Sequence, residues 1–169
     1  MNVAILVARL IIGLGVAAHG SQKLFGWFGG GGVSGTAAYM EGLGYRPGVL
    51  YAALAGLGEL IGGLLVAAGM FNGIGPALVI LVMLVAILTV HLPNGYFNSK
   101  NGWELPAANI AAVLTFAYAG FGKYSVDRIL HLPFFSPQIR WIMLAGAVVL
   151  ALLTYASRHH QAHQATPTA

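Results

Sequence analysis

The sequence predicts an all-α integral membrane protein, built as a four-helix transmembrane bundle with a fifth, C-terminal span. Hydrophobic residues make up 58% of the 169-residue chain and charged residues only 7%, and the mean hydropathy is +0.79. Soluble domains carry about 25% charged residues, so this composition excludes a soluble fold. The apolar residues also form separate runs of the length that a bilayer requires, since about 20 helical residues cross a hydrocarbon core of about 30 Å.

The apolar runs place the core spans at about residues 3–22, 49–70, 74–92 and 105–119, and the fifth span at about 139–155. Between the first two runs, residues 34–43 predict a short helix on the membrane surface. The segment after Tyr155 is polar and rich in histidine, and we expect it to be disordered. Basic residues are divided equally between the two faces of the bundle, so the positive-inside rule does not orient the chain.

The remaining composition narrows the chemistry. Eight basic residues give a formal net charge of +4, but they are scattered between apolar runs, as is ordinary for a membrane protein. We therefore expect no nucleic-acid partner. The chain has no cysteine, which excludes disulfides, thiol nucleophiles and cysteine-ligated iron–sulfur clusters.

The first run is not apolar on all sides. At about 100° per residue, one narrow stripe carries its small and basic residues, and His19 lies at the edge of this stripe. An arginine that faces lipid costs about 2.5–3.5 kcal/mol even on the lenient insertion scale. The arginine at the start of the stripe, Arg9, should therefore face protein or water and should have an acidic partner. The members of the stripe are Arg9, Gly13, Val16, Gly20 and Lys23.

Glu59 is the acidic residue near the middle of the second span, and two interpretations of it remain open. One is a structural ion pair with Arg9 that joins the first two spans. Counted from the same face, Arg9 lies at a depth of about 9 Å and Glu59 at about 16 Å, a gap that an arginine side chain can bridge. The other is a carboxylate that handles protons or binds a ligand, because ionisable groups inside a membrane are functional candidates by default.

We call the end of the bundle opposite the N-terminus face B. Alternating spans bring polar side chains from several separate segments to this end, and Glu59 lies deeper along the same bundle. Face B is therefore the predicted ligand site, lined by His19, Lys23, His91, Asn94, Trp103 and Glu104, with Glu59 beneath them.

His19 and His91 end two different spans at face B. Two such histidines can ligate a haem iron or a metal, hydrogen-bond to a quinone carbonyl, or serve a purely structural role. No membrane run contains histidines at the i, i+4 spacing typical of a metal site. This argues against a metal. We do not expect haem either, and the quinone and structural interpretations remain open.

Five segments in order along residues 3–127 resemble the DoxX family. They are ARLIIGLGVAAHGSQKLFGWFGGGG, GTAAYMEGLGYRPG, LAGLGELIGGLLVAAG, VHLPNGYF and GKYSVD. The resemblance implies that residues 1–127 form a four-helix domain in a bacterial cytoplasmic (inner) membrane. Residues 128–169 depart from the family pattern and add the fifth span and the His-rich tail. The family's recurrent polar positions fall on His19, Lys23, Glu59, His91 and Asn94.

The resemblance also implies association with quinone-linked oxidoreductases or with oxidative-stress complexes in the membrane. Our leading interpretation is a small subunit of a membrane-bound oxidoreductase or respiratory-type complex that binds or neighbours a quinone. His19 or His91 would donate a hydrogen bond to a quinone carbonyl, and Glu59 would accept and release protons. Whether the chain has catalytic activity of its own stays open. The alternatives are a non-catalytic assembly or scaffold subunit and a carrier of a small lipophilic molecule, although we find no inverted repeats of the kind transporters contain. The expected partners are the bilayer and other membrane or peripheral subunits.

Overall fold

The computed structural model describes residues 1–132 and 135–164, and within them the chain is helical and contains no strand. The main helices are α1 (Asn2–Phe25), α2 (Gly32–Gly42), α3 (Gly48–Ala68), α4 (Ile74–Ala86), α5 (Glu104–Ala119), α6 (Val126–Ile129) and α7 (Pro137–Gln164). Short helical turns connect them: η1 (Trp27–Gly29), η2 (Ile87–His91), η3 (Leu92–Asn94) and η4 (Asn98–Lys100). The predicted all-α membrane bundle is confirmed.

Four of these helices are long and apolar enough to cross a bilayer: α1, α3, α4 with its continuation to Asn94, and α7. The predicted fourth core span, α5, has 16 residues and is therefore about 24 Å long, shorter than a typical hydrocarbon core. The C-terminal run, in contrast, is one of the four long helices. Its helix also continues to Gln164, so the expected disorder after Tyr155 is wrong as far as residue 164, and residues 165–169 lie outside the described residues.

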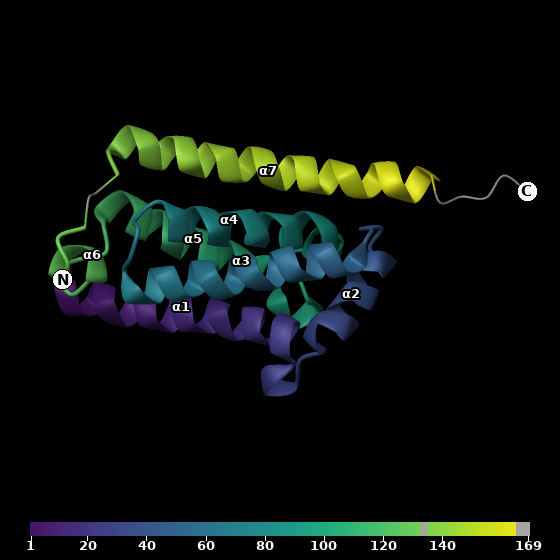
Figure 1. The fold of residues 1–169 in the computed structure, drawn as a ribbon, viewed down its shortest axis with the longest axis horizontal. Coiled ribbons are helices and arrows are strands. Elements are labelled where there is room, and N and C mark those ends of the chain that lie inside the picture. Colours follow the sequence, from purple (N-terminus) through teal and green to yellow (C-terminus); the bar gives the residue numbers. More distant parts are fainter. Residues whose placement is uncertain (133–134, 165–169) are drawn as a thin grey trace, which may run out of the picture.

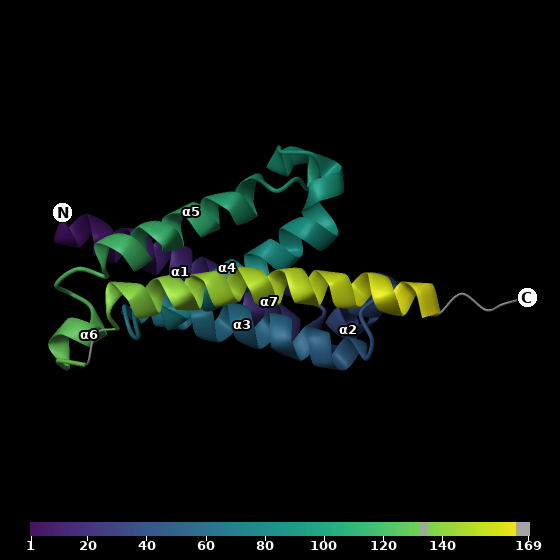
Figure 2. The same ribbon diagram turned by 90° about the horizontal axis from the view of Figure 1, so that it is seen from above.

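The long helices run side by side, with α4 between α3 and α7 (Figure 1). The N-terminus and α6 lie at one end of the bundle, which we call face A, and α2 lies at face B. α2 packs against α3 and α1. Seen from above, α5 runs obliquely to α7 and ends near α6 (Figure 2). The core lies where α4 meets α5, α7 and α3, and it includes Val66, Val79, Val113, Phe116 and Leu144.

The stripe predicted on the first span is buried because it packs against α3. Arg9, Gly13, Val16 and Gly20 are all buried. A Cβ atom on Gly13 would lie 2.5 Å from the Ala67 backbone nitrogen. Real Cβ atoms do not approach backbone this closely, so α1 and α3 are in direct main-chain contact, as small residues permit in membrane helices.

Arg9 does not pair with Glu59, and this part of the prediction is wrong. The Arg9 guanidinium donates to the Ala67 carbonyl (2.7 Å) and to the Tyr124 carbonyl (2.6 Å). The physical reason is that the last carbonyls of a helix lack intrahelical partners and lie at the negative end of its dipole. One carbonyl at the C-terminus of α3 and one before α6 therefore take the place of a carboxylate, and the Arg9 Nε atom has no hydrogen-bond partner.

A second contact closes face A beside Arg9. The Asp127 carboxylate is buried and accepts hydrogen bonds from the backbone N–H groups of Phe71 (2.8 Å) and Asn72 (3.1 Å). The Asp127 N–H donates in turn to the Gly69 carbonyl (3.1 Å). The segment around α6 thus holds the α3–α4 turn in place, and Asp127 belongs to the structure of face A.

Candidate functional site

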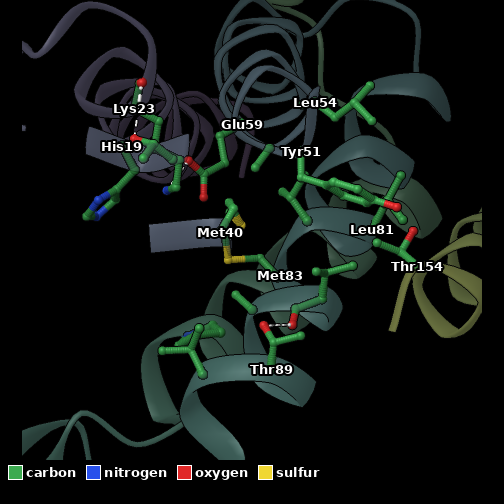
Figure 3. Close-up of a pocket in the computed structure, with 18 of the residues that line it drawn as sticks. His19, Lys23, Met40, Tyr51, Leu54, Glu59, Leu81, Met83, Thr89 and Thr154 are labelled. Atoms are coloured by element: carbon green, nitrogen blue, oxygen red, sulfur yellow. Dashed lines mark hydrogen bonds and ion pairs between the residues drawn. The ribbon is translucent and has the colours of Figure 1, made fainter. Parts of the chain in front are cut away.

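A pocket of about 1060 Å³ opens among the helices on the face B side of the bundle. Its walls come from α1, α2, α3, α4, α7 and the start of α5, and they are mainly apolar. Ligand pockets in proteins usually measure about 300–1,000 Å³, so this one is large. Figure 3 shows a charged group of side chains on one side, Met40 and Met83 in the middle, and a group of hydroxyls on the other side.

The charged side of the pocket is an ion pair between Lys23 of α1 and Glu59 of α3. The Lys23 Nζ atom lies 2.5 Å from Glu59 Oε2, and only 6% of the Glu59 side chain is exposed. The glycines of α3 allow this approach, because a Cβ atom on Gly56 would lie 2.6 Å from Leu24 and 3.3 Å from the Lys23 Cβ. Taking two charges out of water is costly, so a pair that only joins helices would gain little stability from its charges.

His19 lies beside this pair at the edge of the pocket. Its Nδ1 atom lies 2.9 Å from Oε1 of Gln22, and the amide nitrogen of Gln22 donates to the Phe28 carbonyl (3.2 Å). An amide oxygen can only accept a hydrogen bond, so Nδ1 of His19 is the donor. In the neutral ring, Nε2 is then left as an acceptor.

His91 of the η2 turn also lines the pocket, with the same arrangement. Its Nδ1 atom lies 2.8 Å from the Asn101 carbonyl, which again leaves Nε2 as an acceptor in the neutral ring. The turn η2, which ends at His91, is a π-helical turn, and such turns are frequent at functional sites. It widens α4 where the helix lines the pocket.

The hydroxyl side of the pocket is built around Tyr45, which lies between α2 and α3. The Tyr45 ring is 1% exposed and its centroid lies 4.7 Å from that of Tyr51. The Thr89 hydroxyl is near Tyr45 but donates to the Val85 carbonyl (2.7 Å), which leaves the Tyr45 hydroxyl without a hydrogen bond of good geometry. Burial raises the pKa of Tyr45 to about 12, so this hydroxyl is a neutral donor at physiological pH.

We expect Tyr45→Phe to leave stability at pH 7 unchanged or raise it by up to about 1 kcal/mol, because the change removes a buried, unpaired hydroxyl. The effect on the pH profile has a definite sign. The Tyr45 pKa is raised from 10.0 to about 12 in the folded state, so the unfolded chain ionises at a lower pH than the folded protein. The free energy of unfolding of the wild type therefore keeps its full value below about pH 10 and falls toward pH 12. Melting curves between pH 7 and 12 should therefore decline less steeply for the variant, and identical profiles would contradict this view of Tyr45.

Four of the seven predicted ligand residues line the pocket: His19, Lys23, Glu59 and His91. The other three shape the loop before α5. Asn94 donates to the Val90 carbonyl (3.0 Å), and Glu104 accepts from the Asn98 N–H (2.9 Å). The Trp103 ring packs edge-on against Tyr96, with 4.7 Å between centroids.

Sequence reasoning missed the walls that α2, Tyr45, Tyr51 and α7 contribute. Leu150 and Thr154 of α7 both line the pocket, although the C-terminal run looked like an addition to the domain. The one available signal was that this run is amphipathic only near its end, where Thr154, Ser157 and Arg158 follow a long apolar stretch. Within the described residues, no group of three His, Asp or Glu side chains could hold a metal ion.

Fold and pocket together define a multi-pass α-helical membrane protein with a large, mainly apolar pocket that contains a buried ion pair. The DoxX family model matches residues 4–92, which is more than half of the chain, and the protein belongs to this family. The match includes His19, Lys23, Glu59 and His91 and ends before α5 and α7. Neither a curated protein nor a solved structure matches the chain.

Proposed function

We propose that the protein is a small subunit of a membrane-bound oxidoreductase complex in a bacterial cytoplasmic membrane, and that it binds a quinone or quinol in this pocket. The observation that carries the proposal is the Lys23–Glu59 ion pair, placed at one side of a mainly apolar pocket of about 1060 Å³. A quinone has the matching character, because its ring carries a few polar atoms and the rest of the molecule is apolar.

The polar residues suit both redox forms of such a ring. The Lys23 ammonium can donate a hydrogen bond to a carbonyl oxygen, and Glu59 can accept a hydrogen bond from a hydroxyl. Each histidine offers an Nε2 acceptor, as its Nδ1 is already engaged. Interconversion of quinone and quinol moves two protons with two electrons, so a site for it needs groups that hold and release protons. We assign this role to Glu59 and, at the pocket edge, to His19.

The experiment is purification in mild detergent, followed by extraction and quantification of bound quinone and mass spectrometry of co-purifying proteins. His19→Asn should lower the quinone content by about two- to tenfold, the equivalent of one hydrogen bond. His131→Asn is the matched control, because His131 is also exposed but lies at face A. It should retain wild-type quinone.

A wild-type protein that carries no quinone and binds none when it is added would contradict the proposal. Protein subunits recovered without quinone would favour the alternative of a non-catalytic assembly or scaffold subunit. Equal losses in the His19 and His131 variants would place the quinone outside the pocket.

A further inference from the structure

The pocket does not end inside the bundle. Leu54 of α3 and Leu150 of α7 both line it, yet Leu54 is 57% exposed and Leu150 is 54% exposed. Residues that line a pocket and are also half exposed mark places where the pocket reaches the outer surface, and Tyr39 of α2 and Leu105 of α5 mark another such place. Figure 3 places Leu54, Leu81 and Thr154 together on the side away from Lys23 and Glu59.

This opening lies between two membrane-spanning helices. α4 runs between α3 and α7 (Figure 1), α7 packs against α4, and α3 packs against α4 as well. The floor of the opening includes Leu81 and Val85 of α4. Because all three helices are long and apolar enough to span a bilayer, the groove between α3 and α7 opens toward lipid beyond the Tyr51 and Ser157 hydroxyls, which lie 3.2 Å apart and bridge the two helices.

We infer that the groove between α3 and α7 is the passage for the apolar chain of the ligand whose ring lies at Lys23 and Glu59. The inference rests on the proposed quinone function and specifies the ligand class: a quinone with an alkyl or isoprenoid chain. Three observations favour this occupant. The groove is continuous with the ion-pair side of the same pocket, its walls are apolar, and the total volume exceeds what a quinone ring alone would fill.

The inference gives α7 a part in ligand binding. Leu150 and Thr154 form one wall of the passage, whereas Leu152, two positions further along the helix, is exposed and absent from the pocket. A bulky side chain at position 150 should therefore obstruct the chain of a bound quinone. The same side chain at position 152 should face lipid and have no such effect.

The test uses two benzoquinones with the same ring, one with a decyl chain and one with a methyl group in its place. Binding of each is measured in lipid nanodiscs for wild type, Leu150→Trp and the control Leu152→Trp. Each variant is compared with wild type for the same quinone, and the two quinones are not compared with each other. The decyl chain is already in an apolar environment in the lipid, so it adds little to the affinity when it enters the groove. Melting curves confirm that both variants fold.

Leu150→Trp should weaken binding of the decyl quinone by about tenfold, the usual scale for overpacking a close-fitting site, and leave the methyl quinone within about twofold of wild type. Leu152→Trp should change neither. Equal binding of the decyl quinone to both variants would overturn the inference and leave the quinone function intact. Loss of co-purified phospholipid from Leu150→Trp without a change in quinone binding would identify the groove as a lipid site and also overturn it. If neither quinone binds wild type, the proposed function fails, and the inference fails with it.

Discussion

Gly20→Ala should lower the melting temperature and disturb the Lys23–Glu59 pair, whereas Gly15→Ala on the same helix should do neither. A Cβ atom on Gly20 would collide with the Leu60 backbone nitrogen and would lie 2.6 Å from the Gly56 carbonyl oxygen. These are backbone atoms of α3, so no side-chain rotation can relieve the contact and the two helices must separate. Overpacking of this kind costs about 1–3 kcal/mol or more.

Gly15 provides the control because a Cβ atom there would meet nothing within 4 Å. Alanine is also a better helix former than glycine by about 0.5–1 kcal/mol, so Gly15→Ala should be neutral or slightly stabilising. Lys23 follows Gly20 by less than one turn, so a shift of α1 at Gly20 moves Lys23 away from Glu59. We expect reduced quinone content in Gly20→Ala and wild-type content in Gly15→Ala. Equal melting temperatures for the two variants would contradict the close contact of α1 and α3.

The burial of the α1 stripe could be predicted from the sequence because helical periodicity alone decides which residues share a face. Arg9 was expected to pair with the second span, and it does contact α3, whereas the contact of Lys23 with Glu59 of α3 was not predicted. Periodicity does not show which basic residue pairs with Glu59. Arg9 was the predicted partner, but Arg9 instead donates to main-chain carbonyls. Every residue has a carbonyl, so no residue type in the sequence marks such a binding position.

The pocket was half predictable for a related reason. Topology brings span ends to one face, so His19, Lys23 and His91 were placed together without knowledge of side-chain directions. Whether a polar residue at that face enters the pocket depends on local loop geometry, and Asn94 and Glu104 instead bond to the backbone of their own loop. The contribution of α7 depends on which flank of α4 it packs against, and an almost uniformly apolar run does not encode this choice.

The ion pair offers the most discriminating measurement on the site. Lys23→Met should destabilise the protein strongly, because it leaves the Glu59 carboxylate, with a side chain only 6% exposed, without its cation. Removing one partner of a buried pair costs about 3–5 kcal/mol. The loss of stability cannot exceed the cost of protonating the Glu59 carboxylate, because a protonated carboxyl needs no cation. For a glutamate of ordinary pKa about 4.3, this cost is about 4 kcal/mol at pH 7. The destabilisation should therefore shrink as the pH is lowered toward 5.

Adding Glu59→Gln to Lys23→Met should restore most of the lost stability, because the double variant buries no unpaired charge and glutamine has nearly the volume of glutamate. It should not restore quinone, because the donor at Lys23 and the proton-holding group at Glu59 are both gone. A detergent melting series and a quinone assay on the wild type, the two single variants and the double variant separate these effects. Additive losses of stability would show that the two residues do not interact. Wild-type quinone in the stable double variant would mean that the pair serves the fold alone and that the ring binds elsewhere.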